Sequence, residues 1–166
     1  MVTIQKATAE ELDAIWAMVR RAVAQMNELG NPQWGGDYPL REDYAGDIAR
    51  GELYTARVDG ALAGVACINT EQSPEYADLS WQTENKAVVI HRMAVDPEFQ
   101  RHGMGKAFFR YMEETARELG LRALRLDTYS LNDRMQRLIL SQGFRKVGQV
   151  RFRSRPLPFP CFEKAL

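Results

Sequence analysis

The chain has 166 residues, of which 45% are hydrophobic and 27% are charged, and this composition suits one globular domain with a substantial core. Its 22 basic and 22 acidic residues cancel, so composition gives no general attraction to nucleic acid or anionic lipid. The sequence contains no apolar run of membrane-spanning length and no signal peptide pattern. We expect a single domain over residues 1–166, in the cytoplasm, with no nucleic acid or membrane partner.

Cysteine usage argues against both a disulfide framework and a metal site. Cys67 and Cys161 are the two cysteines, which fits a reducing compartment. Both are flanked by apolar residues and are expected to be buried. Their spacing to the histidines matches no zinc pattern, so no metal is expected.

The first half of the chain predicts a strand, two helices and a hairpin. Residues 2–6 alternate as a strand does, and Thr8 with Glu11 forms a capping box that starts a helix. That helix ends at Gly30 and Pro32, and a second, short helix lies between a loop at 31–39 and Gly51. Strands at 52–58 and 61–69 are joined by Asp59-Gly60, a strong hairpin signal. Residues 70–86 are polar and are expected to form a long loop.

The second half predicts a central strand followed by alternating helices and strands. The nearly continuous apolar run 87–95 suits a strand in the middle of a sheet. We expect further strands at 122–127, 144–152 and 159–164, and a helix at 131–142 with Ser130 as its N-cap. A helix at 104–119 should bury a stripe of residues: Met104, Phe108, Tyr111, Met112, Thr115 and Leu119.

The turn between the central strand and the helix 104–119 has the composition of a phosphate-binding loop. Gly103 and Gly105 allow a tight turn, and the helix that follows presents unpaired N–H groups with a positive dipole end. A P-loop is absent, and Phe108 stands where a dinucleotide fingerprint needs glycine. The pattern that remains is Gln-x-x-Gly-x-Gly, which by itself also describes an ordinary helix entry.

A second motif makes the interpretation of the first one more specific. Asn132-x-x-Met135-x-x-Leu138 is followed by Gly143-Phe144. In this order and spacing the two motifs resemble those of the GNAT superfamily of N-acetyltransferases, closely over residues 87–148. The resemblance implies an α/β (α+β) GNAT fold, with a central, mixed, mostly antiparallel sheet of about seven strands and helices on both faces.

The resemblance also implies acetyl-CoA as the acyl donor. The turn would bind its pyrophosphate through backbone amides, with Arg101 and Lys106 adding charge. The strand before the turn would bond the pantetheine arm and stabilise the oxyanion, and Asn132 would contact the same arm, although it could equally be a helix-start residue. The cofactor residues implied are Met93, Ala94, Val95, Gln100, Arg101, His102, Gly103, Met104, Gly105, Lys106 and Asn132.

His91 is the candidate general base. A free alkylamine has a pKa near 10, so a base with a pKa near 7 would help to deprotonate it, and histidine suits that task. His91 lies on the central strand, where this family often places its base, and alternation puts it on the same face as Met93. A core histidine bonded to its neighbours is the alternative. His102 is expected to be a spacer that faces solvent.

The general acid departs from the family pattern. Members usually have a tyrosine where this chain has Ile139, which cannot donate a proton. Tyr129, at the carboxyl end of its strand, is the first substitute, and a packing role is its alternative. Since thiols have a pKa near 8.5, the thiolate can also leave with little help.

Aromatic residues in the loops are candidates for the acceptor site. Trp34, Tyr38 and Trp81 are expected to contact the substrate, because exposed aromatic groups are costly in polar loops. They could instead fold the loops onto the core or contact a second copy of the chain. A mild acidic bias of the same loops would suit an amine: Asp37, Asp43, Glu71, Glu75, Asp78 and Glu84.

The hypothesis favoured by the sequence is an acetyl-CoA-dependent N-acetyltransferase that acetylates a primary amine of a small molecule by direct transfer. A protein Lys or N-terminal acetyltransferase is the alternative within the enzyme class. A non-catalytic acyl-CoA sensor is the alternative outside it, and Ile139 at the usual tyrosine position keeps it open.

Overall fold

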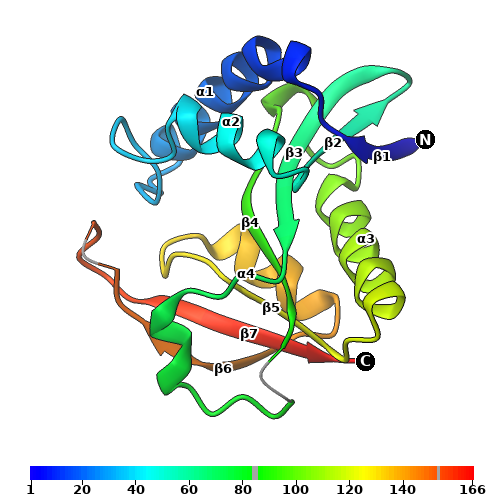
Figure 1. Cartoon of the computed structure of the whole chain (residues 1–166). Helices are drawn as coiled ribbons and strands as arrows, with labels where there is room; N and C mark the ends of the chain where they lie inside the picture. Colours follow the sequence, from blue (N-terminus) through cyan, green and yellow to red (C-terminus); the bar gives the residue numbers. More distant parts are fainter. Residues whose placement is uncertain (84–85, 153) are drawn as a thin grey trace. The chain divides into compact units, whose positions relative to one another are not determined.

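The computed structural model describes residues 1–83, 86–152 and 154–166, so the predicted acidic residue Glu84 lies outside the described residues. Within this part of the chain, seven strands form one mixed sheet in the order β1-β2-β3-β4-β5-β7-β6 (Figure 1). The chain divides into two compact units, Met1–Ile68 with His91–Phe108 and Asn69–Ile90 with Phe109–Leu166. The expectation of one domain is not tested by this division and stays a prediction.

The strands of the first unit form where alternation and turn chemistry predict them. β1 (Val2–Lys6) and β2 (Leu53–Val58) pair antiparallel, and β2 pairs antiparallel with β3 (Ala61–Asn69). Asp59 (φ 50°) and Gly60 (φ 84°) both adopt the left-handed conformation between β2 and β3. This is the backbone that a two-residue hairpin requires, so the predicted hairpin is confirmed.

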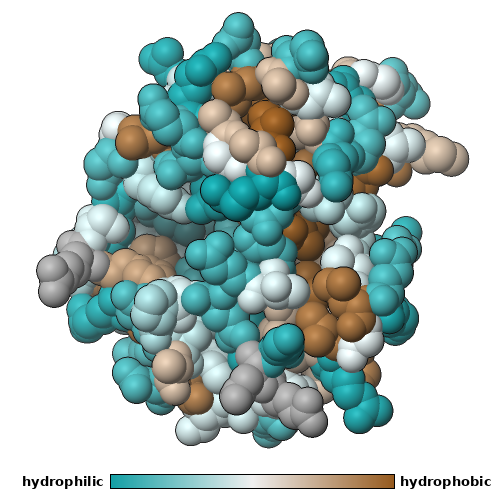
Figure 2. All heavy atoms as spheres, viewed as in Figure 1, coloured by the Kyte–Doolittle hydropathy of each residue, from teal (hydrophilic) through white to brown (hydrophobic). Residues whose placement is uncertain are grey.

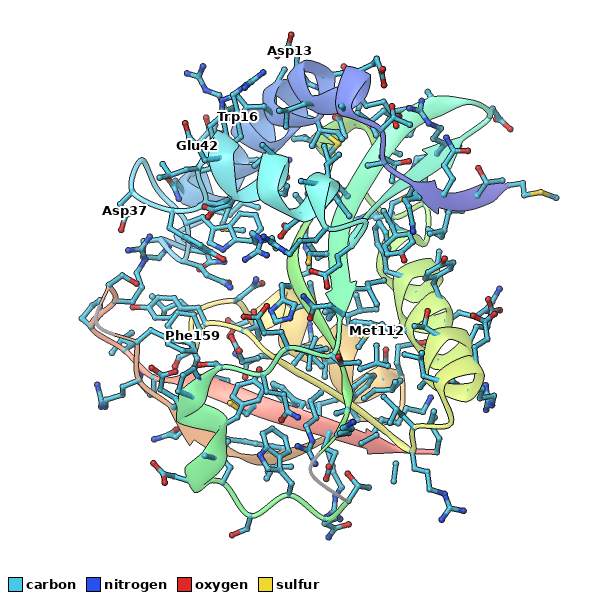
Figure 3. The ribbon with its side chains drawn as sticks, in the orientation of Figure 1. Asp13, Trp16, Asp37, Glu42, Met112 and Phe159 are labelled. Carbon is cyan, nitrogen blue, oxygen red and sulfur yellow. The ribbon has the colours of Figure 1, made fainter. Side chains whose placement is uncertain are left out.

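Two helices of the first unit pack against each other. A single 3₁₀ turn, η1 (Ala9–Glu11), leads into α1 (Leu12–Glu28), and α2 (Arg41–Ala49) follows the loop. The Thr8 amide donates to the Glu11 carboxylate at 2.8 Å, which confirms the predicted capping box. Trp16 of α1 lies toward α2, with its ring centroid 6.3 Å from that of Tyr44 (Figure 3).

β4 (Val88–Val95) is the fourth of the seven strands in the sheet, as its apolar sequence predicts. A short η3 (Pro97–Phe99) and the turn at 100–103 connect it to α3 (Met104–Leu119), whose bounds agree with the prediction. The predicted buried stripe is correct at Met104, Phe108 and Met112. It is wrong at Leu119, which is 57% exposed because the last turn of the helix extends beyond the packed residues.

The strands of the second unit place β7 (Phe159–Ala165) between β5 (Ala123–Asp127) and β6 (Arg145–Val150). β7 pairs antiparallel with both neighbours, and residues 88–89 of β4 pair parallel with β5. The expected long loop contains a 3₁₀ segment, η2 (Pro74–Asp78).

The last helix, α4 (Asp133–Ser141), is shorter than predicted and has a different cap. Asn132, and not Ser130, is its N-cap, since the Asn132 side chain accepts a hydrogen bond from the Met135 amide at 3.1 Å. The Ser130 hydroxyl instead donates to the Pro158 carbonyl. Both residue types cap helices well, and the backbone turns into the helix two residues later than expected.

Each unit has its own cluster of buried apolar side chains. The first gathers around Ile15, Met18, Val19 and Leu53, and the second around Tyr76, Tyr129 and Phe159. Large apolar side chains that remain exposed are scattered, and Figure 2 shows mostly hydrophilic residues on the viewed face. Among the described residues, no helix is both long enough and apolar enough to cross a membrane.

A buried ion pair joins two neighbouring strands of the second unit. Arg125 of β5 and Glu163 of β7 are register partners, their side chains are 2% exposed, and Nε lies 3.2 Å from Oε2. The guanidinium also stacks over the Trp81 ring at 4.3 Å and donates to Gln72. Glu163 accepts further hydrogen bonds from the Gln82 amide and the Thr83 hydroxyl.

We expect Arg125→Met to lower the free energy of unfolding by about 3 kcal/mol, because it leaves the Glu163 carboxylate buried without its counter-charge. The double variant Arg125→Met/Glu163→Leu should recover most of that loss. Urea denaturation measures both, with Arg110→Met on the exposed face of α3 as the control. A loss below about 1 kcal/mol in the single variant would contradict this account.

Candidate functional site

The turn before α3 leads to backbone amides that have no hydrogen-bond partner within the helix. The first hydrogen bond of the helix runs from the Ala107 amide to the Gly103 carbonyl, so the amides of residues 104–106 have no carbonyl within the helix to bond. Arg101 (φ 68°) and Gly103 (φ 80°) are both left-handed, with His102 between them. Such alternation makes successive amides converge on one point, an arrangement that binds anions.

This turn is anchored to other elements of the first unit. Asp96, at its beginning, accepts from the Glu98 amide at 3.0 Å and from Arg21 of α1 at 2.7 Å. The Asp96 amide donates to the Ala63 carbonyl of β3 at 2.8 Å. The Gln100 side chain donates to that of Gln25 on α1. The amides at the start of α3 are therefore held in place before any ligand binds.

His102 is exposed, as predicted, but it also stabilises the turn. Its Nδ1 lies 3.0 Å from the carbonyls of both Phe99 and Gln100, so this nitrogen carries the proton and donates to them. The ring also makes an edge contact with Phe99, with centroids 5.8 Å apart. Its contribution is to fix the turn's conformation.

Two cations flank the convergent amides. Arg101 and Lys106 are both exposed, and neither side chain forms an ion pair or hydrogen bond within residues 1–83, 86–152 and 154–166. Left-handed residues, a helix start and two cations without partners form a site that fits a diphosphate.

β4 ends irregularly just before this turn. Arg92 is left-handed, with φ 50°, in the middle of the strand, and Met93 to Val95 follow it. Residues 91, 92 and 93 are all half-buried, so the alternation that put His91 and Met93 on one face is interrupted at this point. On the neighbouring strand, a side chain at Gly64 would come within 3.2 Å of the Ala94 carbonyl. Glycine at this position allows close approach of the two backbones without crowding.

The Arg92 side chain is held by Asp47 of α2. Nε donates to Oδ2 at 2.7 Å and Nη2 to Oδ1 at 2.6 Å, and the Asp47 side chain is fully buried. Arg92 also donates to the Tyr38 hydroxyl at 3.1 Å, and Arg50 donates to Asp47. Burial by itself would lower the pKa of Arg92, but the hydrogen bonds and charge of Asp47, together with the Tyr38 hydroxyl, raise the pKa of Arg92 above its ordinary value.

Sequence reasoning did not find this network, although both residues carry a signal. Asp47 lies three residues after Tyr44, on the buried face of a short helix. Arg92 interrupts an apolar central strand. A charge in either place needs a partner, and the two charges are opposite.

His91 is half-buried on β4, directly before the left-handed residue. It interacts with other described residues, which is compatible with either role considered for it. Its assignment as the general base stays a prediction.

The predicted site residues of the second unit have structural contacts. Tyr129 is fully buried beside Phe159, with ring centroids 4.8 Å apart, and its hydroxyl accepts from the Leu157 amide at 3.2 Å. Asn132 caps α4, as its structural alternative predicted. Ile139, at the usual tyrosine position, is fully buried. The catalytic role of Tyr129 and the cofactor role of Asn132 stay predictions.

The three aromatic acceptor candidates differ in their surroundings. Trp34 is 6% exposed and packs in the core of the first unit, where it folds the loop down. Tyr38 is 37% exposed and accepts a hydrogen bond from Arg92. Trp81 donates to the Tyr76 carbonyl at 2.8 Å and lies under Arg125. Their substrate contacts stay predictions, and Tyr38 has the most accessible ring.

Local contacts account for part of the acidic bias in the loops. Asp43 accepts from the Leu40 amide at 2.7 Å at the start of α2, and Glu75 accepts from the Ser73 hydroxyl. Figure 3 shows Asp37 at the outer tip of its loop and Glu42 on the outer side of α2. These carboxylates are weak evidence for an amine-binding surface.

Neither cysteine is a nucleophile at neutral pH. Burial, followed by the nearby Asp47 carboxylate, raises the pKa of the Cys67 thiol to about 12. Burial and Asp127 raise the pKa of the Cys161 thiol as well. Both side chains are buried free thiols, as their apolar flanks predict. Among the described residues, no group of three or more His, Cys, Asp or Glu side chains could hold a metal ion.

Comparison with known proteins identifies a family for most of the chain. Residues 20–144 match the acetyltransferase (GNAT) family. A GNAT-family acetyltransferase from Streptococcus agalactiae has a similar structure, with 25% sequence identity and a TM-score of 0.88 over 99% of this chain and 95% of that one. A search of curated protein sequences found no match.

Two further solved structures share the fold at lower identity. The PaiA N-acetyltransferase from Thermoplasma acidophilum, solved in complex with coenzyme A, is 16% identical, with a TM-score of 0.72 over 100% of this chain and 99% of that one. The ribosomal-protein-S18-alanine N-acetyltransferase from Escherichia coli is 19% identical, with a TM-score of 0.69 over 99% and 94%.

Asp127, at the end of β5, is a partly buried acid of the second unit that sequence reasoning did not single out. The Tyr76 hydroxyl donates to it at 2.5 Å. Burial raises the pKa of Asp127 from its ordinary value of 3.8 to about 6, although the hydrogen bond from Tyr76 acts in the opposite direction. The folded protein therefore binds this proton more tightly than the unfolded chain does.

We expect Asp127→Asn to raise the melting temperature above pH 6 and to have little effect at pH 4. The folded-state pKa is raised, so the wild type loses stability as pH increases from about 4 to 6, and the neutral amide does not. Thermal melts from pH 4 to 8 measure this, with the exposed Asp78→Asn as the control. An equal effect of Asp127→Asn at both ends of the range would contradict the assigned pKa.

Proposed function

Because the chain belongs to the GNAT family of acetyltransferases, we propose that it moves an acetyl group from acetyl-CoA directly to a primary amine of a small molecule. The observation that carries the proposal is the turn before α3. It combines two left-handed residues, the amides of residues 104–106 and two cationic side chains that have no partner among the described residues. We assign the reaction to the cytoplasm, because two buried free thiols suit a reducing compartment.

In this proposal the turn binds the diphosphate of the donor. The amides of residues 104–106 donate to its oxygens, at the positive end of a 16-residue helix. Arg101 and Lys106 add charge-assisted contacts, each of about 1.5–3 kcal/mol where desolvated. The turn is already anchored through Asp96 and Gln100, so little ordering entropy is lost on binding.

The strand segment Met93–Val95 positions the acyl end. Acetyl-CoA supplies a thioester whose carbonyl carbon accepts the amine. A backbone amide of this segment donates to the carbonyl oxygen, where negative charge develops, and one such donor contributes roughly 3 kcal/mol to the rate. Residues 93–95 and the turn belong to the same unit and are separated by only a few residues, which favours joint alignment.

We assign His91 as the general base that removes a proton from the ammonium group of the incoming substrate. An imidazole is half-protonated near neutral pH, so it can take this proton and release it to water. The departing thiolate has an ordinary pKa near 8.5 and needs little assistance. A buried Ile139 is therefore compatible with turnover, and Tyr129 keeps the role of proton donor only as a secondary assignment.

A small acceptor is preferred to a protein acceptor because Tyr38, the most accessible of the loop aromatics, is held by Arg92, as a residue that lines a pocket would be. The structural neighbours bear names of both kinds, since one is a ribosomal-protein-S18-alanine N-acetyltransferase and another is described as a phosphinothricin N-acetyltransferase. Assay of free thiol release across a panel of small amines and peptides distinguishes these acceptors. Coenzyme A binding without release on any of them would favour an acyl-CoA sensor.

We expect Arg101→Met and Lys106→Met each to weaken coenzyme A binding by about tenfold, equivalent to about 1.4 kcal/mol, in isothermal titration calorimetry at low salt. Both variants should bind pantetheine as the wild type does, because pantetheine lacks the diphosphate. Arg110→Met, one turn further along α3, is the matched control. Absence of coenzyme A binding by the wild type would refute the proposed function.

We expect His91→Ala to lower kcat by 10²- to 10⁴-fold, the usual contribution of a general base, with coenzyme A affinity unchanged. The acidic limb of the pH profile of kcat/KM should disappear in the variant. Steady-state kinetics from pH 6 to 9.5 measures both effects. An unchanged rate would remove His91 from the mechanism and leave the family assignment intact.

A further inference from the structure

The left-handed residue in β4 is an unusual place for an arginine. At Arg92 (φ 50°) the chain bends between the predicted base and the segment 93–95. The left-handed conformation costs a residue with a side chain about 1–2 kcal/mol, whereas glycine adopts it readily. Such a conformation persists only where its surroundings determine it, and it is found most often at functional sites.

The surroundings of Arg92 hold it at two points, both from α2. The Asp47 carboxylate accepts hydrogen bonds from both Nε and Nη2 of Arg92. This two-point contact fixes the plane of the guanidinium as well as its position. The Tyr44 hydroxyl donates to the Arg92 carbonyl at 3.3 Å, which holds the backbone itself. Asp47 and Tyr44 are both fully buried.

Stability is a poor explanation for this pair. A buried ion pair loses most of its attraction to desolvation, and apolar residues of similar volume often give a more stable fold. Glycine at position 92 would also remove the backbone strain. The arrangement is better explained by the positions that it fixes. A change of backbone direction at residue 92 would displace both His91 and the backbone of Met93–Val95.

The same guanidinium reaches the loop that precedes α2. Its Nη1 donates to the Tyr38 hydroxyl at 3.1 Å, and Tyr38 is the most accessible of the acceptor candidates. One side chain therefore connects the helix, the acceptor loop and the donor-binding strand within the first unit.

Resting on the proposed function, we propose that Asp47 and Arg92 are a positioning pair for acetyl transfer. Asp47 holds Arg92 in the left-handed conformation, and this sets the direction in which residues 93–95 meet the thioester, while Tyr38 aligns the acceptor loop to the same point. Neither residue exchanges a proton or forms a bond with the substrates, so both act through the strand and the loop that they fix.

The test separates positioning from stability through the double variant Arg92→Gly/Asp47→Leu. Glycine accepts the left-handed backbone, and leucine removes the buried charge that a single substitution would leave. We expect a melting temperature close to that of the wild type, a kcat at least tenfold lower, and faster hydrogen exchange of the amides of residues 93–95. Arg92→Lys, which keeps the charge but loses the two-point contact, should also lower kcat.

Arg57→Met is the control, because it removes an ion pair with Glu11 in the same unit. It should lower the melting temperature and leave kcat unchanged. If kcat recovers together with stability in the double variant, the pair is only structural and the inference is overturned.

If the wild type neither binds coenzyme A nor acetylates any amine, the proposed function fails. Hydrogen exchange at residues 93–95 still decides, in that case, whether the pair fixes the strand.

Discussion

A strand in the middle of a sheet can carry a charged side chain only if a counter-charge meets it, and both units of this protein depend on that constraint. In the second unit, Arg125 of β5 meets Glu163 on the adjacent strand. In the first unit, Arg92 of β4 meets Asp47 from a helix. The first pair joins two strands in regular register, whereas the second holds a strand at the point where it stops being regular. Ion pairing therefore serves packing in the second unit and accompanies an irregular strand before the turn at 100–103 in the first unit.

Local signals in the sequence were sufficient for most of the fold. The capping box at Thr8, the Asp59-Gly60 hairpin and the helix at 104–119 are each determined by residues a few positions apart. Such local interactions can be read directly from the sequence. The turn at 100–106 was predictable for the same reason, because glycine spacing and helix polarity are both local properties.

Features that depend on distant residues could not be predicted from the sequence in this way. Trp34 looked like a residue of a polar loop, but its ring completes the core beneath α1. The left-handed Arg92 is bonded to Asp47, 45 positions earlier, and the sequence of the strand does not indicate this partner. Asn132 and Ser130 are both good caps, and the choice between them depends on the path of the backbone, which packing decides.

The division of the chain into units has a consequence for how the molecule could be cut. Each unit is built from two separated stretches, and the chain passes from one to the other after Ile68, Ile90 and Phe108. No contiguous fragment contains one unit alone: a piece ending at Ile68 lacks Arg92 and the turn, and a piece beginning at Phe109 lacks residues 88–89, which pair with β5. To express either unit by itself, its two separated stretches would therefore have to be joined in one new chain, because truncation of the natural chain cannot yield it.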